Sequence, residues 1–213
     1  MKRILMVVAM VISGATCWAQ YDQQALVVLD AMSAKYKKIP AYKADITSSL
    51  INETEGLDEE FQGKISVKGE KYKLELDEQI VINNGTTVWT YLPDVNEVNI
   101  DNYSPDEDEM SPSKIYEAYK TGYKYMLIGE QVKNGVPHAE IDLVPNDKNA
   151  QFFKIKLFVS SKDNSLSSWT MFDKSGNKYE YTIKNFKSLS DAQDADFIFD
   201  AAKYPGVEII DLR

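Results

Sequence analysis

Few side chains in this sequence are of the types that carry out catalysis. The only histidine, His138, follows Pro137 at an expected strand start, so we expect a surface or turn residue rather than a general base. The 33 acidic residues could supply a carboxylate pair for glycoside hydrolysis, but no pair is singled out. Nucleophile-elbow and phosphate-loop motifs are absent from the sequence. We therefore expect a protein that is not an enzyme.

Metal and nucleic-acid chemistry are equally poorly supported. The acidic run at 106–109 lacks the spaced ligands and the closing Glu of a calcium loop, so a solvated loop is expected, with no metal and no cofactor. The chain carries 24 basic and 33 acidic residues, a net charge of −9. This negative charge disfavours nucleic acid and anionic lipid headgroups as partners.

The remaining chemistry is that of binding, and it centres on an aromatic pair. Trp89 and Tyr91 are two residues apart in a stretch rich in turn residues, so they lie on the same face of a strand. With a two-residue turn at Asn84-Gly85, Ile80 would face Trp89; with a loop at 93–96, Tyr91 would face Val98 and Trp89 would face Ile100. The pattern predicts one apolar face formed by Ile80, Trp89, Tyr91, Val98 and Ile100, directed towards the interior.

The N-terminal stretch resembles an export signal in its layout. Lys2 and Arg3 precede an apolar run and then small residues, which predicts a signal peptide at 1–19 and a single mature domain at 20–213. Lipid attachment at Cys17 is the alternative, but the preceding residues match a lipobox poorly, so soluble export is favoured. The predicted location is an extracytoplasmic compartment, and the mature chain would contain no cysteine.

The elements that must position the aromatic pair are mostly strands. An amphipathic helix is expected from Tyr21 to about Lys38, where Pro40 stops it. The period then changes to two, which predicts about eleven antiparallel strands joined mostly as a meander. A second short helix is expected from an N-cap at Ser111 and Pro112 to Gly122, with Ile115 and Tyr119 one turn apart.

A sheet of this length should curl into a barrel or half-barrel. Packing alone explains an inward aromatic residue about as well as ligand binding does. Eleven curled strands, however, enclose more width than their own side chains readily fill. An apolar cavity beneath amphipathic helices suits acyl chains, because each buried CH₂ contributes about 0.8 kcal/mol without a specific polar partner.

Several stretches resemble one family. They are "FQGKISVKGEKYKLEL" at 61–76, "INNGTTVWTYLPDVNEVNI" at 82–100 and "ADFIFDAAKYPGVEIIDLR" at 195–213, together with the signal and the first helix. These are similar to the outer-membrane lipoprotein carrier (LolA-like) family, in which they correspond to an F-x-G strand, a D-G-x-x-x-W-x-Y hairpin ending in Pro, and an F-x-F-x-x-P-x-G-V ending. The resemblance covers nearly the whole mature chain.

The resemblance implies an unclosed antiparallel barrel of eleven strands, mainly β, covered by short helices that form a lid. It implies a monomeric periplasmic carrier that takes lipid-modified proteins from an inner-membrane lipoprotein-releasing ABC transporter and carries their acyl chains towards an unidentified outer-membrane acceptor. The alternatives are a lipid- or glycolipid-binding protein of the same fold with another cargo, and a structural interaction domain with a packed interior.

The concave face would be the lipid site. Its expected lining residues are Phe61, Ile65, Tyr72, Leu74, Ile80, Trp89, Tyr91, Val98 and Ile100, with Ile115 and Tyr119 from the lid. One departure from the family stands at Lys68-Gly69, where proteobacterial carriers have an Arg-Pro that latches the lid. Lys68 keeps the charge but not the planar fork of Arg, so it is a weaker candidate latch.

Overall fold

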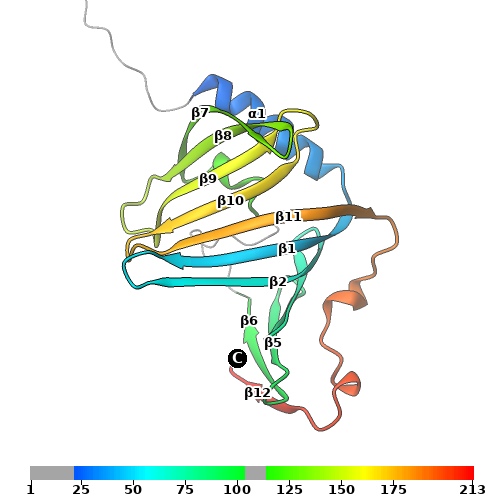
Figure 1. Cartoon of the computed structure of the whole chain (residues 1–213). Coiled ribbons are helices and arrows are strands. Elements are labelled where there is room, and N and C mark those ends of the chain that lie inside the picture. The colour runs from blue at the N-terminus through cyan, green and yellow to red at the C-terminus, as the bar shows by residue number, and fades with distance from the viewer. Residues whose placement is uncertain (1–21, 104–113) are drawn as a thin grey trace, which may run out of the picture.

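The computed structural model describes residues 22–103 and 114–213 (Figure 1). Three sequence predictions therefore lie outside the described residues: the signal peptide at 1–19, the acidic loop at 106–109, and the helix cap at Ser111 and Pro112. The assignment of 20–213 to a single domain stays a prediction. Within the described ranges, no helix is long and apolar enough to cross a membrane.

The described residues form one α-helix, twelve strands and three short 3₁₀ turns. In chain order the elements are α1 (Gln23–Lys37), β1 (Ala41–Asn52), β2 (Leu57–Lys68), β3 (Lys71–Leu76), β4 (Ile80–Asn83), β5 (Thr87–Leu92), β6 (Glu97–Asn102), η1 (Ala118–Lys120), β7 (Tyr123–Lys133), β8 (Val136–Pro145), β9 (Phe152–Ser160), β10 (Leu166–Asp173), β11 (Lys178–Leu189), η2 (Asp194–Phe197), η3 (Ala201–Lys203) and β12 (Glu208–Asp211).

All twelve strands belong to one sheet, in the order β12-β6-β5-β4-β3-β2-β1-β11-β10-β9-β8-β7. The neighbours are antiparallel except β12, which pairs in parallel with β6. Strands β1 to β6 form one antiparallel meander and strands β7 to β11 form another, and the two meet where β1 pairs with β11. The sheet does not close, because β12 and β7 remain at its two ends. The predicted fold class, a mainly β, unclosed barrel-like sheet, is confirmed, with a twelfth strand that the sequence did not reveal.

The α1 helix begins and ends where the sequence predicts. The Asp22 carboxylate caps its start by accepting bonds from the backbone N–H groups of Gln24 (2.8 Å) and Ala25 (3.3 Å). A further bond from the Leu127 N–H (3.0 Å) ties this cap to β7. These bonds stabilise the charged form and lower the pKa of Asp22, with the Leu127 bond as the main cause.

One face of α1 is buried against the sheet. The buried stripe has helical spacing and consists of Ala25, Leu29, Met32, Ser33 and Tyr36. In Figure 1 the blue α1 ribbon lies behind strands β7 to β10. We call the face of the sheet that packs against α1 the inner face, and the opposite face the outer face.

The second predicted helix is wrong within the described residues. Residues 114–120, here called the cover segment, form turns and the single 3₁₀ turn η1 instead of an α-helix. Ile115, Tyr116 and Tyr119 in this segment are all buried. A 3₁₀ turn suffices to direct these side chains to one side, and a segment this short gains little from α-helix formation, whose nucleation is costly.

The β4–β5 hairpin has a longer turn than predicted. Ile80 pairs with Tyr91 and Ile82 with Trp89, so the predicted pairing of Ile80 with Trp89 is wrong by two residues. The reason lies in the turn, where the Asn84 carboxamide accepts bonds from the N–H groups of Thr86 (3.0 Å) and Thr87 (2.8 Å). A shift of two residues preserves the face, so Ile80, Trp89 and Tyr91 still share one side.

Gly63 in β2 occupies a position that only glycine fits. A Cβ atom there would overlap the backbone carbonyl oxygen of Glu75 on β3. Gly63→Ala is therefore expected to destabilise the protein by about 2–4 kcal/mol, because backbone of a paired strand must move. Gly129→Ala is the control, since no atom lies within 4 Å of its added Cβ. Urea denaturation of both variants measures the effect, and equal stability of the two would contradict the clash.

Candidate lipid-binding face

Cross-strand pairing assigns each strand residue of the first half of the sheet to a face. Ala44 on β1 pairs with Ile65 on β2, Ile65 pairs with Leu74 on β3, and Leu74 pairs with Val81 on β4. Paired residues project to the same side of a sheet. All four belong to, or pack against, the apolar cluster that also contains the buried side chains of α1, so they lie on the inner face.

Four of the predicted lining residues lie on the inner face. Ile65 and Tyr72 are buried in the apolar cluster, and Leu74 is partly buried against it. Phe61 pairs with Ser48 and shares the side of Ile65 by alternation along β2. The cover residues Ile115 and Tyr119 belong to the same cluster. These residues share the inner face, and their role as a lipid lining stays a prediction.

The other five predicted lining residues lie on the outer face, which corrects the sequence interpretation. Because Leu74 pairs with Val81, the neighbouring Ile80 projects to the opposite side. Trp89, Tyr91, Val98 and Ile100 follow Ile80 through the pairings of β4, β5 and β6. The predicted pairs of Tyr91 with Val98 and of Trp89 with Ile100 are confirmed, but their common face is the outer one.

Trp89 and Tyr91 are here called the outer aromatic patch. The C-terminal segment, residues 190–207, packs on this patch at Tyr91. The Tyr91 ring lies 4.3 Å from the ring of Tyr204 and 5.8 Å from that of Phe199 (centroid distances), and its hydroxyl donates to Asn96 Oδ1 at 3.0 Å. Figure 1 shows this segment, in orange and red, leaving β11 and running to β12 beside β6. The aromatic hairpin therefore packs against the protein's own C-terminal segment.

Aromatic side chains join the cover segment to the inner face. The Tyr36 and Tyr116 rings stack with their centroids 3.5 Å apart, and the hydroxyl groups of Tyr42 and Tyr116 lie 3.1 Å apart. Burial raises the pKa of Tyr36 to about 12 and that of Tyr116 well above its usual value. These phenols are consequently neutral hydrogen-bonding groups at physiological pH, suited to a largely apolar interior.

A polar clasp holds the cover segment to α1 at the surface. The Tyr119 hydroxyl donates to Asp30 Oδ1 (2.6 Å), and Lys120 Nζ donates to Ser33 Oγ (2.9 Å). Glu117 accepts from Lys120 (2.6 Å) and forms an ion pair with Lys37 (3.1 Å). The bond from Lys120 is the main cause that lowers the pKa of Glu117. The sequence analysis did not identify this clasp, because Tyr119 and Lys120 lie 89 and 87 residues from their partners on α1.

Lys68, the candidate latch, contacts the C-terminal segment. Its Nζ lies 2.7 Å from Asp194 Oδ1 and donates to the Ala192 carbonyl oxygen at 3.0 Å, while Lys71 Nζ reaches Asp194 Oδ2 at 2.8 Å. The two lysines lower the pKa of Asp194 from 3.8 to about 2. Because this folded-state pKa lies below the unfolded value, the contribution is complete above about pH 4 and is lost as the pH falls through about 2. A latching role of Lys68 towards the cover stays a prediction.

His138 is buried, which corrects its assignment as a surface or turn residue. Only 5% of the residue is exposed. Its Nδ1 lies 2.8 Å from the Val136 carbonyl oxygen and its Nε2 lies 2.7 Å from Ser167 Oγ. Among the described residues no group of three His, Cys, Asp or Glu side chains could hold a metal ion.

The fold is an unclosed β-sheet whose apolar inner face is covered by α1 and the cover segment, and the family follows from comparison. The model of the family described as outer membrane lipoprotein carrier protein LolA matches residues 37–200. The chain belongs to this family, and membership supports a role in binding lipoproteins or their lipids. A comparison with the curated proteins found no match.

Three solved structures are similar to this chain, and the first of them supports the fold. An uncharacterized conserved protein from Thermus thermophilus is 13% identical, with a TM-score of 0.59, over 89% of this chain and 99% of that one. A LolA superfamily protein from Nitrosomonas europaea is 12% identical, with a TM-score of 0.46, over 83% and 98%. LprF from Mycobacterium bovis is 11% identical, with a TM-score of 0.45, over 82% and 98%. At such identities the likeness concerns the fold alone.

Proposed function

We propose that this protein is a periplasmic carrier that binds the acyl chains of lipoproteins between the inner face and its cover. Membership of the LolA family carries the proposal. The inner face supports it, because Ile65, Tyr72 and Leu74 offer apolar surface without any charge to desolvate. The donor would be an inner-membrane lipoprotein-releasing ABC transporter, the destination an outer-membrane acceptor, and the working form a monomer exported by the signal at 1–19.

Uptake would require the cover segment to move. In the described residues α1 and the cover segment shield the inner face from solvent, and Leu29 and Leu157 are fully buried. The ion pairs of Glu117 with Lys120 and Lys37 in this clasp are at the surface, where each contributes at most about 1 kcal/mol. An acyl chain that gains about 0.8 kcal/mol per buried CH₂ could displace the apolar cover contacts as it enters.

Delivery would then follow from differential affinity. The cover competes with the acyl chain for the same inner face, so the site holds its cargo less tightly than an uncovered site would. An acceptor with a better site takes the chain on, and no covalent step is needed. The protein in this scheme binds and releases lipid without being an enzyme.

The burial of the inner-face side chains also fits a competing interpretation, an interaction domain whose interior is simply packed. A carrier of glycolipid is the other alternative, since the inner face selects apolar chains and not their headgroups. Each alternative predicts a different bound compound in the protein isolated from cells: free glycolipid for the glycolipid carrier, and no acyl compound for the interaction domain.

Mass spectrometry of the protein purified from the periplasm of its own host separates these possibilities. We expect acylated peptides to co-purify in near-equimolar amount and to be lost on extraction with organic solvent. Co-purified free glycolipid would favour the other cargo. Protein free of any acyl compound, even after overproduction of a lipoprotein, would contradict both carrier functions.

A further inference from the structure

Strands β10 and β11 separate at one end and leave a cleft between them. Their pairing runs from Phe172 with Lys178 to Ser168 with Thr182 and stops there, although both strands continue. A bulge in the β9–β10 pairing between Leu166 and Ser168 bends β10 away at this point. The cleft between the strands has a volume of about 550 Å³, within the usual range for small-molecule sites.

The lining of this cleft is cationic and rich in hydroxyl groups. It includes Lys133, Lys162 and Lys184 together with the hydroxyls of Ser165, Ser167 and Ser168. The only carboxylate that lines it is Asp163. In a chain of net charge −9, this local excess of positive charge is the reverse of the overall balance.

The single carboxylate is already neutralised. Asp163 Oδ2 forms an ion pair with Lys35 Nζ of α1 at 2.6 Å, and Asp163 Oδ1 accepts from Ser165 Oγ at 2.7 Å. These hydrogen bonds outweigh the effect of burial and hold the pKa of Asp163 well below its usual value. Within 4.0 Å, Lys133, Lys162 and Lys184 form no ion pair with any carboxylate of the described ranges.

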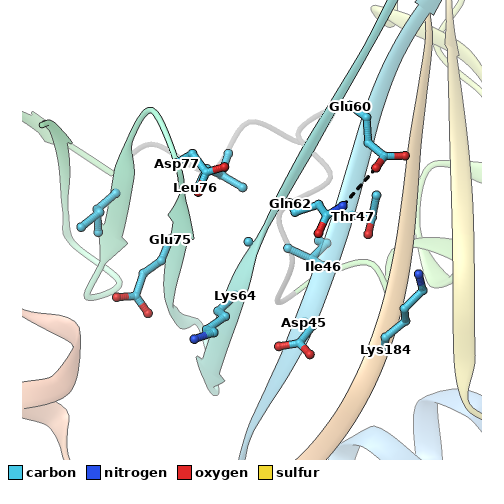
Figure 2. Close-up of a pocket in the computed structure, with 12 residues that line it drawn as sticks. Asp45, Ile46, Thr47, Glu60, Gln62, Lys64, Glu75, Leu76, Asp77 and Lys184 are labelled. Carbon is cyan, nitrogen blue, oxygen red and sulfur yellow. Dashed lines mark hydrogen bonds between the residues drawn. The ribbon is translucent and has the colours of Figure 1, made fainter. Parts of the chain in front are cut away.

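A neighbouring hollow shows the contrast. Figure 2 shows a depression of about 650 Å³ across β1, β2 and β3, which shares Lys184 with the cleft. There, the carboxylates of Asp45, Glu60, Glu75 and Asp77 outnumber the two lysines. Its mixed charges provide no anion site. Lys184 borders both hollows, whereas Lys133 and Lys162 line the cleft and not this depression.

Lys133 is the most constrained of the three cations. Its Nζ lies 3.1 Å from the centre of the Phe158 ring and donates to Ser168 Oγ at 3.2 Å. Because Ser168 Oγ accepts from Lys133, its own hydrogen remains to be donated to a ligand. Burial lowers the pKa of Lys133, partly offset by the more distant charges of Glu180 and Glu140. A half-buried ammonium group of this kind gains from an anion beside it.

His138 fixes another hydroxyl of the cleft wall. Its Nδ1 faces a carbonyl oxygen, that of Val136, so the ring proton is assigned to Nδ1. Nε2 then accepts from Ser167 Oγ at 2.7 Å, which holds the serine in one orientation with its oxygen at the cleft. The wall is therefore organised before any ligand binds.

We propose that this cleft binds a phosphoryl group carried on a small polyol, as in a glycerol phosphate ester. Ammonium groups and hydroxyl donors are protein groups that bind phosphate. The cleft presents the ammonium groups of Lys133, Lys162 and Lys184 and the free hydroxyl hydrogen of Ser168, while the hydroxyl hydrogens of Ser165 and Ser167 are donated to Asp163 and His138. The volume leaves space for a polyol beside the phosphate. The site is separate from the apolar inner face, so the proposal does not depend on the lipid-carrier function.

Titration of the purified protein with glycerol 3-phosphate, followed by calorimetry and by amide chemical shifts, tests this site. We expect saturable binding in the millimolar range or tighter, with shifts at Ser165, Ser167 and Thr182. Lys133→Gln should weaken binding by about tenfold through loss of a charge-assisted contact. Lys124→Gln removes the same charge from an exposed position of β7 outside the cleft, so it should bind as the wild type does.

Vesicles distinguish the two sources of such a ligand. Co-sedimentation with phosphatidylglycerol vesicles but not with phosphatidylcholine vesicles, lost in Lys133→Gln, would assign the site to a lipid headgroup; binding of glycerol 3-phosphate alone would assign it to a free phosphate ester. If Lys133→Gln fails to fold, Lys184→Gln takes its place, because it removes another positive charge of the cleft at an exposed position. Absence of glycerol 3-phosphate binding at millimolar concentrations, or unchanged binding in a folded Lys133→Gln and in Lys184→Gln, would overturn the proposal.

Discussion

Leu74→Glu is expected to abolish acyl-chain binding while leaving a folded protein. Leu74 lies on the inner face, partly buried against the apolar cluster rather than at its centre. A carboxylate there can reach water when the site is empty, but an acyl chain would have to desolvate it at a cost of several kcal/mol. Displacement of a fluorescent fatty-acid probe measures the loss, which we expect to exceed a hundredfold.

Trp89→Glu is the matched control for this prediction. Trp89 is also partly buried on a strand of the same meander, but it projects to the outer face. The sequence alone pointed to Trp89 as a lining residue, whereas its position in the sheet predicts a destabilised protein that binds the probe normally. Loss of binding in Trp89→Glu, with binding retained in Leu74→Glu, would mean that the acyl chain occupies the outer face instead.

The sequence predicted the pairing of the β5–β6 hairpin correctly, missed the register of the β4–β5 hairpin by two residues, and did not predict how successive hairpins are related. Alternation and the loop at 93–96 sufficed to pair Tyr91 with Val98, because the turn fixes the register of adjacent strands. Which side chains of β4, β5 and β6 lie on the inner face, the face that packs against α1, depends on the link between β3 and β4. There a turn closed by the bond from the Leu76 N–H to the Gln79 carbonyl oxygen pairs Leu74 with Val81. A difference of one residue in that link exchanges the faces.

Other features escaped the sequence because distant segments determine them. β12 is four residues long and pairs in parallel with β6, more than 100 residues earlier, so no local pattern marks it. His138 follows a proline near a turn, as expected, but Ser167 and the β8–β9–β10 meander bury it. The cover segment lacks the predicted helix because its contacts with α1, and not its intrinsic propensity, decide its conformation.

Phe197→Ala is expected to destabilise the protein by about 3–5 kcal/mol, the range for emptying a buried aromatic site. Phe197 lies in η2 of the C-terminal segment and is only 1% exposed, although most of its neighbours in the chain are exposed. It helps to line a small cavity of about 350 Å³ between this segment and the outer face, next to Ile82 and Tyr204. Urea denaturation should show the full loss in a single transition.

Ile198→Ala provides the comparison for Phe197, since the adjacent side chain is 50% exposed and should change stability by no more than about 0.5 kcal/mol. A large difference between the two variants would show that the C-terminal segment unfolds together with the sheet. The outer aromatic patch of Trp89 and Tyr91 would then serve to anchor this segment. Equal, small effects would instead mean that the segment detaches independently, which would expose the outer patch as a surface available to a partner.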